Sequence, residues 1–215
     1  GPFGFQIRGG GSASHSGRAR DYDYSPVTQR AIVAVGTGGL FRYQGVFPVS
    51  IGDNLPLCNI NSVAGHPADT NIIFAGTGEE GLGFGKGLLR STNSGGSWDV
   101  IPMAPGNEYP SFIFKVRYNP QNYQILYAAT TLGFQRSTNG GSSWTVQLPG
   151  VITDFAWNPV NFNIIYAVIS SGTSGAGFYI SRDGGSSFNE VGTGTLPPDN
   201  TWGNVKLAIS AADTS

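Results

Sequence analysis

Short stretches in which large apolar and polar residues alternate run through this 215-residue chain. Residues 114–118 and 154–157 are two of them, and after a turn each is followed by a run of mostly apolar residues. Alternation is typical of a half-buried β-strand, and a short run rich in β-branched residues is typical of a strand buried on both faces. No window shows the i, i+3, i+4, i+7 spacing of an amphipathic helix. The pattern therefore predicts an all-β fold with almost no helix.

A proline turn separates the alternating stretch from the apolar run, and its spacing is the same at four places. The apolar runs begin five residues after Pro26, Pro67, Pro120 and Pro159, at residues 31–35, 72–76, 125–129 and 164–168. A constant spacing that recurs four times indicates a repeated structural unit.

An eight-residue pattern, Ser-x-Asn/Asp-x-Gly-x-x-aromatic, occurs at residues 91–98, 137–144 and 181–188, at intervals of 46 and 44 residues. The Asn or Asp side chain can accept hydrogen bonds from the backbone N–H groups of its own turn, and glycine tolerates the positive φ of a tight turn. The aromatic residue opens the next strand with a large apolar surface. We interpret the pattern as a structural turn built by Ser91, Asn93, Gly95, Trp98, Ser137, Asn139, Gly141, Trp144, Ser181, Asp183, Gly185 and Phe188.

Together these signals predict four short strands in each repeat, which is the unit of a β-propeller blade. The predicted blades cover about residues 19–51, 60–102, 112–149 and 151–192, and residues 204–209 form the first strand of the next blade. Residues 1–18, rich in Gly and Ser, are expected to be a flexible lead-in to a partial propeller at residues 19–215. Because a lone strand leaves unpaired edges, we expect the remaining blades of a larger propeller, or a partner chain, beside it.

The eight-residue pattern resembles the Asp-box, or bacterial neuraminidase repeat, with Asn in place of Asp at residues 93 and 139 and Phe in place of Trp at residue 188. With the proline spacing and residues 17–20 and 36–41, the chain resembles the Asp-box propellers of secreted bacterial proteins. These are related in architecture to sortilin-type receptors, sialidases, xyloglucanases and photosystem II assembly factors. The resemblance implies a secreted, cell-surface or periplasmic propeller, but a fold alone does not determine an activity.

Composition narrows the functional classes. The 33 Gly and 13 Pro suit short strands joined by tight turns, and a net charge of −1 with 12% charged residues provides no basic stripe for nucleic acid. No run approaches the length of about 18 apolar residues that a membrane span needs, so we do not expect an integral membrane protein. The lone cysteine, Cys58, is expected to be a small buried apolar residue. His15 and His66 are isolated, and we expect no metal site and no cofactor.

The loops opposite the eight-residue turns vary widely in length, and binding sites are usually built on such loops. Aromatic side chains there can stack on sugar rings. Glu79 and Glu80 can bind a cation or act as an acid–base pair, although adjacent glutamates in a glycine-rich loop point apart. The sequence assigns no catalytic residue, and its candidate ligand-binding residues are Asp53, Glu79, Glu80, Phe84, Lys86, Glu108, Tyr109, Asp199 and Trp202.

The sequence favours a non-catalytic binding module or scaffold for a glycan or a protein partner. The resemblance to xyloglucanases implies a catalytic Asp just before a Gly-Gly pair in the first blade, whereas this chain has Thr37 before Gly38 and Gly39. The arginines are spread along the chain and do not suggest the cluster of a sialidase. The alternative is a glycoside hydrolase of the xyloglucanase or sialidase type whose catalytic residues lie partly outside this chain. An assembly factor or a receptor ectodomain is a third option.

Overall fold

The computed structural model describes residues 18–36, 38–43, 45, 47–78, 83–103, 109–171, 176–191 and 205–210. In these residues the regular structure consists of strands, which form four antiparallel sheets of four strands each. The all-β propeller fold predicted from the sequence is confirmed.

Each sheet is formed by four strands that follow one another in the chain. Blade 1 contains β1 (Ala19–Ser25), β2 (Arg30–Val35), β3 (Gly39–Tyr43) and β4 (Pro48–Ser50). Blade 2 contains β5 (Ile60–Gly65), β6 (Ile73–Thr77), β7 (Leu88–Ser91) and β8 (Asp99–Ile101). Blade 3 contains β9 (Ile113–Tyr118), β10 (Leu126–Thr130), β11 (Gly133–Ser137) and β12 (Thr145–Leu148). Blade 4 contains β13 (Val151–Trp157), β14 (Ile165–Ser171), β15 (Gly177–Ser181) and β16 (Asn189–Val191).

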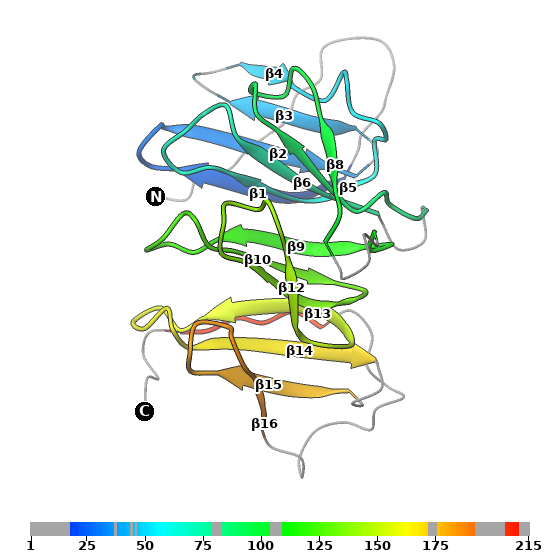
Figure 1. Cartoon of the computed structure of the whole chain (residues 1–215). Coiled ribbons are helices and arrows are strands. Elements are labelled where there is room, and N and C mark those ends of the chain that lie inside the picture. The colour runs from blue at the N-terminus through cyan, green and yellow to red at the C-terminus, as the bar shows by residue number, and fades with distance from the viewer. Residues whose placement is uncertain are drawn as a thin grey trace.

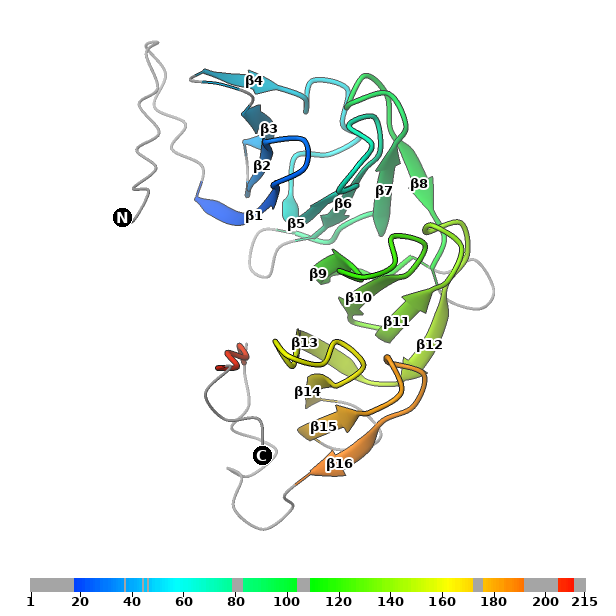
Figure 2. The ribbon, with the colours of Figure 1, turned by 90° about the vertical axis from the view of Figure 1, so that its left-hand side faces the viewer.

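The blades stack face to face along the chain (Figure 1) and curve into an arc (Figure 2). The first strand of every blade, β1, β5, β9 and β13, lies on the inner side of the arc, and the fourth strand lies on the outer side (Figure 2). The second strands of the two middle blades are buried on both faces, and every residue of β6 and of β10 is buried. This burial explains why these strands have continuous apolar sequences rather than alternating ones.

Three apolar clusters fill the spaces between consecutive blades. Ile32, Leu40, Val63 and Leu89 belong to the cluster between blades 1 and 2. The next two clusters join blades 2 and 3 around Phe74 and Trp144, and blades 3 and 4 around Tyr127, Phe134 and Phe155. Burial of these side chains contributes about 1.5–3 kcal/mol for each large apolar residue, so the fold depends mainly on contacts between neighbouring blades.

The three eight-residue patterns form turns of the same geometry, which we call box turns. In residues 91–98, Ser91 Oγ donates to Asn93 Oδ1 at 3.0 Å and accepts from Gly95 N at 2.8 Å. The Asn93 carboxamide oxygen also accepts from Ser97 N at 2.8 Å. The equivalent serine-to-glycine contacts are 2.9 Å in residues 137–144 and 2.8 Å in residues 181–188. The polar side chains of each box turn therefore satisfy the backbone groups of that turn.

Each box turn also contacts the proline turn of its own blade, so both lie on one face of the arc. Ser94 N donates to Asn71 O at 2.9 Å, Gly140 N to Gln124 O at 2.8 Å, and Gly184 N to Asn163 O at 2.9 Å. The loops that join second to third strands, and one blade to the next, therefore lie on the opposite face. Cys58 lies in one of these loops, before β5, and it is exposed. The expectation that this thiol is buried was wrong, because the loop carries it outside the clusters between blades.

Candidate functional site

A cavity of about 230 Å³, partly open to solvent, lies on the inner strands of the arc. Four cationic side chains and two carboxylates line it, which gives a formal excess of two positive charges. Its lining comes from all four first strands and from the segment 205–210, and consists of Arg20, Asp21, Asn61, Phe114, Lys115, Arg117, Asp154 and Lys206. The structure thus brings together charged residues that are far apart in the sequence.

One position on each inner strand explains this gathering. Asp21, Ser62, Lys115 and Asp154 all lie five residues before the proline of their turn. Each contacts the backbone of the neighbouring inner strand or segment, so equivalent residues face the same central space. The acceptors are Asp21 for Val63 N at 3.0 Å, Ser62 for Val116 N at 3.0 Å and Asp154 for Leu207 N at 2.9 Å, while Lys115 donates to Phe155 O at 2.7 Å.

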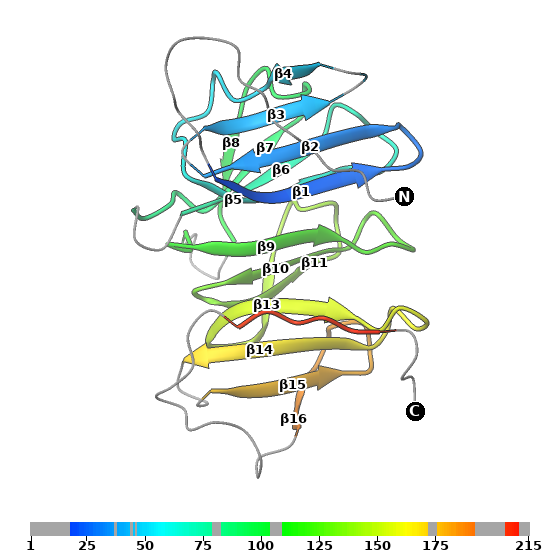
Figure 3. The same cartoon turned by 180° about the vertical axis from the view of Figure 1, so that it is seen from behind.

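Residues 205–210 extend this arrangement. The segment runs along β13 on the inner side of the arc (Figure 3). Besides the Leu207 contact, Thr153 Oγ1 donates to Val205 O at 3.2 Å and Lys206 Nζ approaches Thr153 O at 3.4 Å. Lys206 is thereby placed at the edge of the cavity with an exposed side chain.

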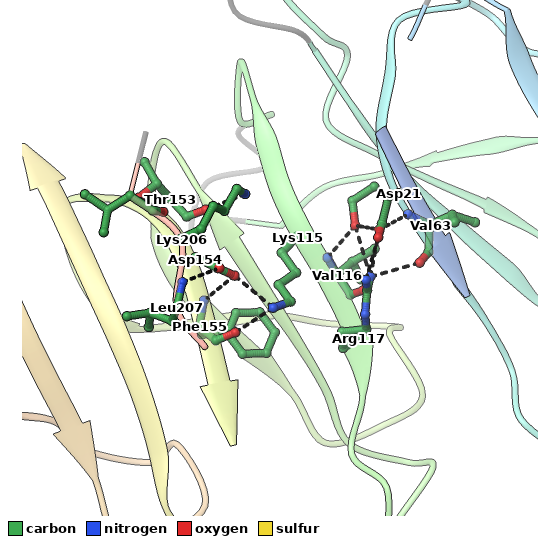
Figure 4. A network of polar contacts seen from close by, with 12 residues as sticks. Asp21, Val63, Lys115, Val116, Arg117, Thr153, Asp154, Phe155, Lys206 and Leu207 are labelled. Carbon is green, nitrogen blue, oxygen red and sulfur yellow. Dashed lines mark hydrogen bonds and ion pairs between the residues drawn. The ribbon is translucent and has the colours of Figure 1, made fainter. Parts of the chain in front are cut away.

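Asp21 and Arg117 form a two-pronged ion pair between blades 1 and 3 (Figure 4). The two guanidinium nitrogens of Arg117 lie 2.6 Å and 2.8 Å from Asp21 Oδ1 and Oδ2. Asp21 Oδ2 also accepts from Ser62 Oγ at 2.6 Å. Burial acts to raise the pKa of Asp21, but the hydrogen bonds and the charge of Arg117 outweigh it, and the pKa of Asp21 is lowered. The carboxylate is therefore held in its ionised form.

Lys115 and Asp154 form the second ion pair of the cavity (Figure 4). Lys115 Nζ lies 2.8 Å from Asp154 Oδ1 and 5.2 Å from the centre of the Phe155 ring. Burial lowers the pKa of Lys115, and the positive charges of Arg117 and Lys206 act in the same direction against the attraction of Asp154. The cations of the cavity therefore repel one another despite the two ion pairs.

Both carboxylates of the cavity already interact with a cation and with backbone N–H groups. A glycosidase needs one carboxylic acid that can donate a proton and a second carboxylate across a cleft. Asp21 is ionised against Arg117, and both oxygens of Asp154 already accept hydrogen bonds from Lys115, Phe155 N and Leu207 N. Burial raises the pKa of Asp23, but Asp23 accepts from Gly65 N at 2.7 Å and does not line the cavity.

A row of aromatic rings leads from the loop face into the cavity. Phe84, in the loop between β6 and β7, is 77% exposed, and its ring centre lies 5.7 Å from that of Phe112. The Phe112 ring lies 6.1 Å from that of Phe114, which lines the cavity. Tyr109 is 51% exposed and borders the same loop, beside Gly87. The cavity thus has an apolar approach on one side.

The candidate residues from the sequence are only partly placed by the structure. Phe84 and Lys86 are exposed in the loop between β6 and β7, and Tyr109 lies beside Gly87 at the end of that loop. Asp53 lies in an exposed turn and accepts from Ser50 Oγ at 2.6 Å. Glu79, Glu80, Glu108, Asp199 and Trp202 lie outside the described residues. Sequence reasoning missed the charged inner-strand residues, although their constant distance from the proline turns was available as a signal.

Other kinds of site were sought in the described residues. There, no three His, Cys, Asp or Glu side chains gather where they could hold a metal ion. No helix in the described part of the chain is long and apolar enough to cross a membrane.

Comparison with known proteins identifies the fold. No protein-family model matches the sequence, and no curated protein matches it significantly. Among solved structures, the chain is similar to the GH74 xyloglucanase from Xanthomonas campestris, with a TM-score of 0.60, 18% identity, and coverage of 85% of this chain and 31% of that chain. It is also similar to a GH74 enzyme of Niastella koreensis, with a TM-score of 0.60, 19% identity, and coverage of 91% of this chain and 32% of that chain. The similarity to YCF48 bound to a D1 peptide has a TM-score of 0.52 and 16% identity, with coverage of 81% of this chain and 54% of that chain. The chain thus spans about a third of the length of these GH74 proteins, and at such identities the likeness shows the fold alone.

Proposed function

We propose that this chain is a non-catalytic propeller module that binds a protein or glycan partner at the inner-strand cavity and at the loops around it. The observation that carries the proposal is the pairing of both cavity carboxylates with cations, which leaves an excess of positive charge and no unpaired carboxylate among the described lining residues. The solved relatives support a binding role on this fold, since one of them is a propeller with a bound peptide. The GH74 relatives make a glycan partner the natural second ligand to test.

The cavity is tested by reversing its charge. The variant Lys206→Glu changes an exposed cavity residue and leaves the apolar clusters intact. Arrays of peptides and of oligosaccharides are probed with the wild-type chain and with this variant, and Kd values are measured by calorimetry for the ligands found. We expect saturable binding that K206E weakens at least tenfold. Arg182→Glu, an exposed change on the box-turn face, is the matched control and should leave Kd unchanged.

The hydrolase alternative has its own readout. Reducing ends released from xyloglucan are measured for the wild type and for D21N and D154N. We expect no release above the buffer control from any of the three. Turnover by the wild type that both substitutions abolish would contradict the non-catalytic assignment.

A further inference from the structure

The charges of the cavity favour an anionic ligand. Lys115 and Arg117 are each paired with one carboxylate, and Arg20 and Lys206 supply the two excess positive charges. Within the described residues, Lys206 Nζ approaches Thr153 O at 3.4 Å. Lys206 is exposed at the cavity edge, so a ligand can reach its ammonium group without breaking an ion pair. An anion placed there would relieve the mutual repulsion of these cations.

The row formed by Phe84, Phe112 and Phe114 indicates which class of molecule carries the anionic group. Phe84 presents an exposed ring, whereas Phe112 and Phe114 are partly buried and tilted 40° to their neighbours in the row. Stacking of an extended polysaccharide requires several exposed ring faces in succession. One exposed ring followed by two partly buried rings instead fits a single apolar side chain, which a peptide can carry near an acidic residue.

We propose that the inner-strand cavity binds an acidic peptide segment, with a carboxylate at Lys206 and an apolar side chain against the aromatic row that runs from Phe114 in the cavity lining to Phe84. This inference rests on the proposed binding function and specifies its ligand class. The ion pairs of Asp21 and Asp154 keep the inner strands in place, and Lys206 and the aromatic row make the recognition contacts.

The test uses short labelled peptides. The probe is a fluorescein-labelled, C-terminally amidated peptide with the core Asp-Phe-Glu, and it is compared with the Asn-Phe-Gln and Asp-Ala-Glu analogues by fluorescence anisotropy at low and high salt. We expect the acidic peptide to bind at least tenfold more tightly than its amide analogue at low salt, and the difference to shrink at high salt because of screening. Replacement of Phe by Ala in the peptide should also weaken binding severalfold.

Variants of the protein identify the contacts. Lys206→Gln should remove most of the preference for the acidic peptide over its amide analogue. Phe84→Ala should weaken binding of the Phe-containing peptide and leave the affinity for the Ala-containing peptide unchanged. Arg182→Gln, exposed and distant from the cavity lining, is the control. Thermal melts of each variant exclude loss of fold as the cause.

Three results would overturn the inference. Equal affinity for the acidic and amide peptides would show that the carboxylate is not recognised, and an unchanged Kd in K206Q would show that it binds elsewhere. Tighter, Lys206-dependent binding of trigalacturonate would assign the cavity to an acidic glycan, with the proposed binding function still standing. Release of reducing ends in the hydrolase assay would contradict the proposed function itself.

Discussion

At the scale of single residues, the box turns show how one carboxylate can replace a carboxamide. Asp183 accepts hydrogen bonds from Ser181 Oγ at 2.7 Å and from Ser187 Oγ at 2.6 Å. Asn93 and Asn139 occupy the same position in the other two turns. Each accepts from the first serine of its turn at 3.0 Å, but donates from Nδ2 to the later serine, Ser97 or Ser143, at 2.9 Å and 2.8 Å. Slight burial acts to raise the pKa of Asp183, but the hydroxyl and backbone hydrogen bonds of Ser187, Ser181 and Ser186 lower it to about 2.

We predict that Asp183→Asn makes the free energy of unfolding less dependent on pH in the acidic range. Because the folded pKa is depressed, the carboxylate stabilises the fold above the unfolded pKa of about 3.9, and this contribution is lost as the pH falls toward 2. Asp183 is exposed, so the gain at neutral pH should be under about 1 kcal/mol. Urea unfolding of wild type and D183N should show a gap at pH 6 that closes near pH 2. A gap that persists at pH 2, or that D99N at an exposed strand end reproduces, would contradict this account.

At the scale of elements, the box turns also dock one blade on the preceding one. Gly141 has a φ of +81°, and a Cβ added to it would lie 2.4 Å from Phe74 Cζ of blade 2. A Cβ added to Gly95 would lie 2.7 Å from Ile51 Cβ, and one added to Gly185 would lie 3.1 Å from Tyr127 Cε1. A second glycine in the same turn, Gly140, has a φ of +66°, but an added Cβ would meet nothing closer than Gln124 Oε1 at 3.4 Å.

This contrast separates backbone strain from a clash between blades. Gly140→Ala is expected to cost about 1–2 kcal/mol, the penalty for a left-handed non-glycine residue. Gly141→Ala carries the same penalty and also forces Phe74 to move, so we expect a total of about 2–5 kcal/mol. Chemical denaturation of both variants measures the two costs. Equal losses would mean that the turn does not need its close contact with Phe74.

The elements also show what the sequence can and cannot predict. Strands and turns follow from local signals, namely alternation, proline and the box pattern, and the propeller follows from their repetition. The cavity depends on which strands lie side by side. Asp21 and Arg117 are 96 residues apart, and no local pattern pairs them. Because the loops opposite the box turns vary in length, the candidate ligand-binding residues were predicted there. The residues five positions before each proline would have indicated the inner strands instead.

At the scale of the whole molecule, the contacts between blades mainly join neighbouring blades, as expected for a repeat architecture. The pair Asp21–Arg117 is different because it joins blade 1 directly to blade 3, and Arg117 also donates to Val63 O of blade 2 at 3.1 Å. One side chain of β9 thus fixes the inner edges of three blades. Coupling between the first and third blades should therefore depend on this guanidinium.

We predict that Arg117→Gln increases local opening of blade 1, although residue 117 belongs to blade 3. Loss of the guanidinium leaves the Asp21 carboxylate without its cation. A broken buried pair costs about 3 kcal/mol or more, and because this pair is partly exposed, we expect a cost below about 3 kcal/mol. Hydrogen exchange followed by mass spectrometry should show faster exchange in peptides covering β1 and β5, with β14 and β15 unchanged, because the latter strands touch neither Asp21 nor Arg117. Arg182→Gln, which removes an exposed guanidinium at the end of β15, should leave β1 protected. A uniform increase over all four blades would instead mean that Arg117 stabilises the fold globally and does not specifically tie the first blade to the third.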